Sequence, residues 1–197
     1  MGKILKMRST FSRPADATAY TAGDEISSSA TAGSVVRAVF NLSGYTRGRI
    51  VAAAIDVTPA SGNFVVTASD MEMQLYKTVD APAAVGDNVT MPIGAAVQAL
   101  SLGTWRFDDG AWLNQLGALT AGTSAFQEVP ANMAVPTATP GLQVQHVPGH
   151  FFTFEGGLAD APGATSRQLT ASLRALGAWT PTAVVNAFGI TIDIEVE

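Results

Sequence analysis

The C-terminal stretch "AFGITIDIEVE" (187–197) alternates apolar and polar residues almost perfectly, and this period of two constrains the fold more than any other feature. The apolar residues share one parity: Phe188, Ile190, Ile192, Ile194 and Val196. Successive side chains of a β-strand point to opposite faces. The pattern therefore predicts a strand with one buried face and one face that is wet or meets a polar partner.

Similar alternation or short apolar runs occur in four earlier segments. Together with the last strand, the predicted core strands cover residues 35–42, 50–57, 71–76, 169–176 and 188–196. The chain has 19 glycines and 10 prolines, which interrupt it at short intervals and keep each strand short. The sequence therefore predicts an all-β fold, either a β-sandwich or a jelly-roll-like barrel.

The organisation predicted along the chain has two parts. Residues 1–33 form an extended N-terminal arm, and residues 34–197 form the β-sandwich body. Within the body, residues 92–168 are rich in proline and tryptophan and predict an elaborated, loop-rich insertion rather than a second domain.

The arm contains the stretch "TFSRPADATAYTAGDEISSSA" (10–30), which is too polar and broken for a core strand and has no helical stripe. Its apolar residues are spaced, with Phe11, Tyr20 and Ile26 at intervals that a simple linker would not need. We expect an extended arm to lie along a partner's surface with these residues as anchors. The alternative is that the arm packs along its own domain.

The arm is also basic. Lys3, Lys6, Arg8 and Arg13 all precede the first acidic residue, Asp16. The whole chain has 11 Lys+Arg and 16 Asp+Glu, so the rest holds seven basic and 16 acidic residues, a net charge of −9. Such an arm can be attracted to an acidic partner surface, or it can be a solvated tail.

Composition excludes several classes of function. The net charge of −5 disfavours broad nucleic-acid binding, which needs a basic face. The absence of cysteine excludes disulfides, thiolate catalysis and cysteine-based zinc sites. No apolar run reaches the roughly 18 residues that span a bilayer, and we expect no membrane partner.

No motif indicates catalysis. His146 and His150 flank "PG", which prevents the helix that a pair of zinc ligands at this spacing needs. The sequence has no "GxSxG", no phosphate-binding "GxxxxGK[ST]" and no "GxGxxG". The acidic segments "GDN" (86–88) and "FDDG" (107–110) predict Asx-type turns rather than calcium loops. We expect no enzyme activity, no metal and no cofactor.

Three tryptophans, Trp105, Trp112 and Trp179, have two interpretations. Tryptophans are most often core or interface anchors. Exposed on one face, they would form a sugar-stacking platform, which would make the chain a receptor- or carbohydrate-binding module of a tail or fibre.

The opening stretch resembles the start of a family of tailed-phage virion proteins. The residues that carry the resemblance are "RPAD" (13–16), "TAY" (18–20) and "AGD" (22–24), followed in order by "AVFNLSG" (38–44), "GRIVAAAIDV" (48–57) and "MQLYKTVDAPAAVGDNVTM" (73–91). The C-terminal "LRALGAWTPTAVVNAFGITIDIEVE" (173–197) is similar to the family's last two strands. The resemblance covers residues 10–91 and 169–197 and leaves the middle of the chain unassigned.

The resemblance implies a non-enzymatic structural protein of the virion, plausible as a decoration (cement) protein on the capsid surface, made in the host cytoplasm. It implies the major capsid protein as partner and a homotrimer, because cement proteins typically occupy threefold positions. The predicted capsid-binding residues are those of the arm: Lys3, Lys6, Arg8, Phe11, Arg13, Tyr20 and Ile26.

Overall fold

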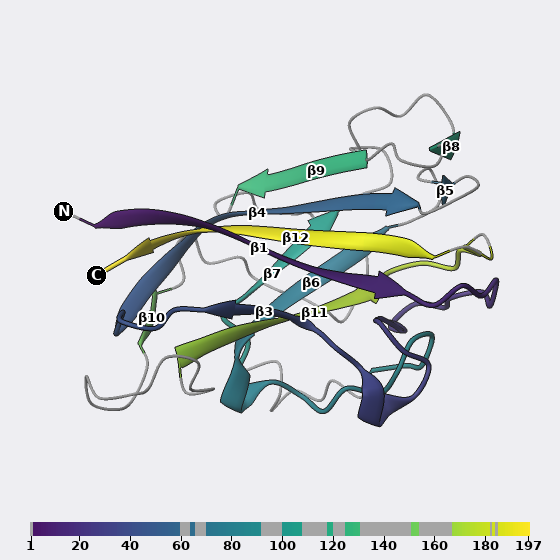
Figure 1. Cartoon of the computed structure of the whole chain (residues 1–197), viewed down its shortest axis with the longest axis horizontal. Coiled ribbons are helices and arrows are strands. Elements are labelled where there is room, and N and C mark those ends of the chain that lie inside the picture. Colours follow the sequence, from purple (N-terminus) through teal and green to yellow (C-terminus); the bar gives the residue numbers. More distant parts are fainter. Residues whose placement is uncertain are drawn as a thin grey trace, which may run out of the picture.

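The computed structural model shows two antiparallel β-sheets packed face to face (Figure 1). It describes residues 2–59, 64–65, 70–91, 100–107, 118–119, 125–130, 151–153, 167–181, 183 and 185–197. The predicted all-β sandwich is confirmed. In the part of the chain that the structure describes, no helix is long and apolar enough to cross a membrane.

The first sheet has the strand order β1–β12–β4–β10, and β9 also pairs with β4. Its strands are β1 (Lys3–Arg13), β12 (Asn186–Val196), β4 (Arg47–Pro59), β10 (Phe151–Thr153) and β9 (Ala125–Pro130). The second sheet has the order β2–β11–β6–β7, and β3 also pairs with β11. Its strands are β2 (Glu25–Ile26), β11 (Gln168–Ala175), β6 (Met71–Lys77), β7 (Gly103–Phe107) and β3 (Ala38–Asn41).

Four short elements complete the described structure. Strands β5 (Phe64–Val65) and β8 (Ala118–Leu119) form a separate two-stranded ribbon. The 3₁₀ turns η1 (Ala32–Ser34) and η3 (Thr78–Asp80) follow β2 and β6 in the chain.

The five predicted core segments correspond to β3, β4, β6, β11 and β12. In β12 the burial alternates as the sequence predicts, and the buried parity packs between the two sheets: Phe188, Ile190, Ile192, Ile194 and Val196. The strand β12 lies inside the first sheet, paired with β1 on one side and with β4 on the other. Its apolar face therefore contributes to the centre of the core.

Two strands of the second sheet, β6 and β11, depart from simple alternation, because their polar parity is buried as well. The alternation of Met71, Met73 and Leu75 with polar residues predicts a half-buried strand over residues 71–76, and this prediction is wrong because both faces are buried. Glu72 of β6 lies between two arginine positions, with Arg174 opposite it on β11 and Arg106 opposite it on β7. Arg174 donates to Glu72 over 2.8 Å, and Gln74 donates to the same carboxylate over 3.0 Å. These contacts supply the hydrogen bonds that buried polar groups require.

The N-terminal residues are also part of the sandwich, so of the two interpretations of the arm the structure agrees with packing along its own domain. β1 pairs with β12 in antiparallel register from Lys3↔Val196 to Arg13↔Asn186. It forms the edge of the first sheet and approaches the second sheet at β3, where the Val39 N–H donates to Ser9 Oγ over 3.1 Å. The predicted boundary at residue 33 has no counterpart in the pairing, because β2 and β3 lie on the same side of β11.

Most of the predicted insertion, residues 92–168, lies outside the described residues. Three of its described strands belong to the sandwich, whereas β8 pairs with β5. β7 pairs with β6 of the second sheet, whereas β9 and β10 both pair with β4 of the first sheet.

Candidate functional site

The residues predicted to bind a partner fall into two environments. Lys3, Lys6 and Arg8 are exposed on β1. The other four are buried within the chain itself: Phe11, Arg13, Tyr20 and Ile26. Four of the seven predicted contacts are therefore unavailable to a partner in this structure, and their roles are structural.

The outer face of the first sheet carries a group of charged residues that are accessible to solvent. We call its eight ionic residues the charged face: Lys6, Arg8, Arg47, Arg49, Asp56, Asp193, Glu195 and Glu197. Each cation lies beside an acid of the same face. Lys6 pairs with Asp193 at 3.9 Å and Arg8 with Asp56 at 2.8 Å, while Arg47 pairs with Glu197 and Arg49 with Glu195. The basic residues of β1 are thus balanced by acids of β12 and β4, which weakens the case for long-range attraction by this segment.

The pair between Arg8 and Asp56 spans a whole strand. Arg8 is on β1 and Asp56 on β4, with β12 between them. The residue of β12 beneath the pair is Gly189, which is opposite Asp56 in the sheet. A Cβ at this position would lie 2.3 Å from Arg8 Nη2 and 2.4 Å from Asp56 Oδ1. The glycine therefore leaves the space in which the two side chains meet.

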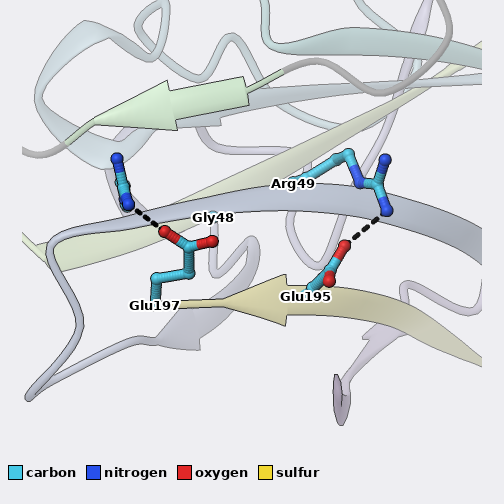
Figure 2. Close-up of a pocket in the computed structure, with 5 residues that line it drawn as sticks. Gly48, Arg49, Glu195 and Glu197 are labelled. Carbon is cyan, nitrogen blue, oxygen red and sulfur yellow. Dashed lines mark hydrogen bonds and ion pairs between the residues drawn. The ribbon is translucent and has the colours of Figure 1, made fainter. Parts of the chain in front are cut away.

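A pocket of about 340 Å³ opens at one end of the charged face. It is lined by Arg47, Gly48 and Arg49 of β4 together with Glu195 and Glu197 at the end of the chain. Figure 2 shows the two arginines and the two glutamates joined in pairs across the strands. The pairs are exposed, and exposed ion pairs of this kind contribute only about 0–1 kcal/mol each. They can therefore exchange for charges of a partner at little cost.

The motifs that carry the family resemblance meet in a buried cluster of Arg13, Tyr20 and Asp87. Arg13 Nε donates to the Tyr20 hydroxyl over 2.6 Å, and that hydroxyl donates to Asp87 Oδ1 over 2.6 Å. Arg13 Nε also lies 3.4 Å from Asp87 Oδ2. Arg13 binds Asp16 in addition, and the Ser27 N–H donates to Asp87. "RPAD", "TAY" and "GDN" therefore form one structural unit.

Burial dominates the acid–base properties of this cluster. It raises the pKa of the Tyr20 hydroxyl, and the neighbouring Asp87 carboxylate raises it further, whereas Arg13 acts in the opposite direction. Burial also raises the pKa of Asp87, against hydrogen bonds from the Ser27 N–H and Tyr20 O–H and the charge of Arg13. The cluster is closed off from solvent, and its groups bind one another rather than a ligand.

The third motif, "AGD", forms the turn beside this cluster. Gly23 has φ +97°, which favours glycine, and Asp24 accepts hydrogen bonds from the Thr21 N–H, the Thr21 hydroxyl and the Thr90 hydroxyl. The Asp24 side chain thereby joins the N-terminal segment to the segment after "GDN". Burial opposes ionisation of Asp24, but these hydrogen bonds hold its pKa below the usual value.

Two of the three tryptophans are buried. Trp105 lies in the core on β7, and Trp179 stacks on Tyr20 with ring centroids 4.8 Å apart. Neither contributes to an exposed sugar-binding platform. Trp112 lies outside the described residues, as do His146, His150 and most of "FDDG".

Nothing in the described ranges brings together three or more His, Asp or Glu side chains in a way that would hold a metal ion. The "GDN" segment forms a turn, with Gly86 at φ +110° and Asn88 at φ 59°, but the Asp87 carboxylate accepts from Tyr20 and Ser27 rather than from the local backbone of the predicted Asx-type turn. Its aspartate, however, belongs to the buried cluster. That role follows from contacts between distant segments, and the sequence carries no local signal of it.

The sequence matches no protein-family model and no curated protein. Among solved structures it is similar to viral capsid proteins at low scores. The 60-mer BFDV capsid protein aligns with a TM-score of 0.34 and 10% identity, over 100% of this chain and 94% of that chain. The human norovirus GI.7 Houston strain particle aligns with a TM-score of 0.33 and 12% identity, over 98% of this chain and 32% of that chain. The structure of Cocksfoot mottle virus aligns with a TM-score of 0.25 and 12% identity, over 99% of this chain and 95% of that chain. Scores this low carry no argument about function, and the fold assignment rests on the strand pairing.

Proposed function

We propose that this chain is a non-enzymatic structural protein of a tailed-phage virion, which decorates the capsid by binding the major capsid protein. The observation that carries the proposal is the buried cluster. The motif that contains Asp87 lies 67 positions after Tyr20, and yet Arg13, Tyr20 and Asp87 contact one another directly. Motifs that assemble into one unit are evidence that the resemblance concerns a shared architecture rather than chance similarity of short segments.

The sandwich suits this role physically. A protein that stabilises a shell needs a rigid body and an accessible surface, and it needs no active site. The described residues provide a core between two sheets and a flat outer face of small, polar and paired charged side chains. Of the predicted contact residues, Lys6 and Arg8 remain accessible on this face, and Lys3 is exposed near the start of the same strand.

The test is binding of the purified full-length chain to capsids assembled without it. Capsids and protein are mixed and sedimented together, and the stoichiometry of bound chain is measured. We expect saturable binding, with capsids that already carry the protein as the control. If the folded chain stays in the supernatant with these capsids and binds tails or host cells instead, the decoration role is wrong. A Lys3→Glu, Lys6→Glu variant shows whether β1 faces the capsid, since it then binds more weakly.

A further inference from the structure

The end of the charged face beside the pocket has charges arranged in two columns. Arg47 and Arg49 lie on β4. Glu195 of β12 is opposite Arg49, and Glu197, which directly follows β12, lies beside Arg47. Within each strand the charges are two residues apart, so they point to the same face at a spacing of about 7 Å. One column is positive and its neighbour is negative.

Such a pair of columns is complementary to itself. A two-fold axis that runs between β4 and β12, parallel to both strands, would exchange the columns without changing their levels. Arg47 of one copy would then face Glu197 of the other, and Arg49 would face Glu195. Isologous contacts of this kind are the commonest way in which identical chains associate.

The neighbouring strands follow the same symmetry. At the level of Glu195 and Arg49, the strands follow one another in the order β1, β12, β4 and β10. Ile4 is opposite Glu195, and Phe151 is opposite Arg49. The same axis that exchanges β12 with β4 would place β1 of one copy over β10 of the other. Ile4 is 63% exposed, and the contact would bury it. The contact between copies would therefore explain why Ile4 is exposed beside these charged residues.

We propose that this surface, centred on the pocket, binds the same surface of a second copy of the chain about a two-fold axis. The ion pairs within one copy do not prevent this. The side chains of Arg47 and Glu197 are 64% and 54% exposed, so much of each remains accessible to a second partner. The proposal does not depend on the capsid role, and its symmetry differs from that of the trimer that the family resemblance implies.

The experiment is a charge exchange between copies of the full-length chain. Arg47→Glu gives a face with acids in both columns, and Glu197→Arg gives a face with bases in both. Each variant alone meets like charges across the axis, so we expect its dimer dissociation constant to rise by about tenfold or more. Lys77→Glu and Asp80→Arg, on the second sheet and on η3, change the net charge by the same amounts and are expected to leave dimerisation unchanged.

The decisive sample is the mixture of the two variants. In a mixed pair, the acid introduced by Arg47→Glu in one chain faces the base introduced by Glu197→Arg in the other, and the unchanged Arg47 faces the unchanged Glu197. We therefore expect the mixture to form heterodimers, although each variant alone is monomeric at the same concentration. A double variant, Arg47→Glu with Glu197→Arg, is expected to dimerise alone. The mixture separates a contact between copies from an effect within one copy, because the internal ion pair is lost in each single variant and is not restored by mixing them.

Mass is measured by light scattering and sedimentation, and Ile4→Ser supplies an uncharged variant that should also weaken the dimer several-fold. Circular dichroism confirms that each variant is folded. A wild-type chain that remains monomeric, a dimer or trimer that Arg47→Glu does not weaken, or a mixture of the single variants that fails to associate would each overturn the proposal.

Discussion

Tyr20 connects the N-terminal segment to Asp87, 67 positions later, because its hydroxyl both accepts from Arg13 and donates to Asp87. We expect Tyr20→Phe to lower the free energy of unfolding by about 1–3 kcal/mol, since it leaves a buried donor and acceptor without their partner while the ring stack on Trp179 remains. Urea unfolding measures this. Tyr45→Phe, at a half-buried position outside the cluster, is the control. Equal effects of the two substitutions would contradict the connecting role.

Asp24 gives a pH-dependent prediction. Its folded-state pKa is lowered, so its hydrogen bonds stabilise the fold above the ordinary carboxyl pKa of about 4 and are lost as the pH falls through the folded pKa. Asp24→Asn cannot accept the same set of hydrogen bonds and should cost about 1–2 kcal/mol at pH 7. The difference from wild type should shrink in acid. Measuring the free energy of unfolding of both proteins at pH 7 and near pH 3 tests this. A stability difference that grows as the pH falls would contradict the prediction.

At Gly189 the prediction concerns the coupling between Arg8 and Asp56 rather than the free energy of unfolding. Its replacement by alanine displaces only the flexible ends of Arg8 and Asp56, and alanine also restricts the unfolded chain, so the net change should stay within about 1 kcal/mol. The interaction between the two side chains should nevertheless be lost. A double-mutant cycle of Arg8→Ala and Asp56→Ala measures their coupling, expected at roughly 0.2–1 kcal/mol in wild type and near zero in Gly189→Ala. Equal coupling in both backgrounds would contradict this role of the glycine.

At this scale the sequence predicts residue types better than residue roles. The apolar parity of β12 identifies core side chains correctly because burial follows directly from the period of two. Arg13 and Tyr20 were expected at a partner interface, since a cation and a tyrosine in a polar segment have no local reason to be buried. Their burial depends on Asp87, which is 74 positions after Arg13, and a single sequence contains no signal of that contact.

Among the elements, β1 differs most from its predicted role, because residues predicted to form an arm form an edge strand. If residues 1–15 were a free arm, deleting them would leave the sandwich intact. In this structure the deletion removes the edge strand β1, the stack of Phe11 on Phe188 and the arginine of the buried cluster. Phe11→Ala alone should lower the free energy of unfolding by about 3–5 kcal/mol. We expect the truncated chain to be unfolded or aggregated by circular dichroism and size exclusion, because β12 loses its neighbour.

A matched truncation of residues 1–2, which precede β1, should have almost no effect on stability. If the chain without residues 1–15 unfolds cooperatively at the wild-type temperature, then β1 contributes little and the N-terminus is an arm after all.

A signal for β1 was present in the sequence. In "KILKMRSTFSR" (3–13), Leu5, Met7 and Phe11 alternate with Lys6, Arg8 and Thr10, which is the period of two that identified the other strands. The basic charge obscured it, because a run of cations at a terminus is commonly a solvated tail. Charged residues on an edge strand also discourage pairing with other chains, so the same residues are compatible with a strand.

Over the whole molecule, the two ends of the chain depend on each other. β1 begins at residue 3, β12 ends at residue 196, and they pair along their full length (Figure 1). β12 also pairs with β4, so the last strand of the chain occupies an interior position in the first sheet. Pairing over such long separations in sequence is associated with slow folding.

This topology predicts that the chain cannot fold until its C-terminal strand is available. Without β12, the first sheet loses the contact between β1 and β4, and the core loses the buried side chains of Phe188, Ile190, Ile192 and Ile194. At about 1.5–3 kcal/mol for each buried apolar side chain, the loss is comparable to the 5–15 kcal/mol that stabilises an ordinary domain. We therefore expect the chain of residues 1–185 to be degraded rapidly by protease and to show no cooperative transition on heating. Adding a synthetic peptide of residues 186–197 should restore protection, because the missing strand has one continuous binding site between β1 and β4. Protection of the truncated chain without the peptide would mean that the second sheet and the buried cluster fold independently of the first sheet.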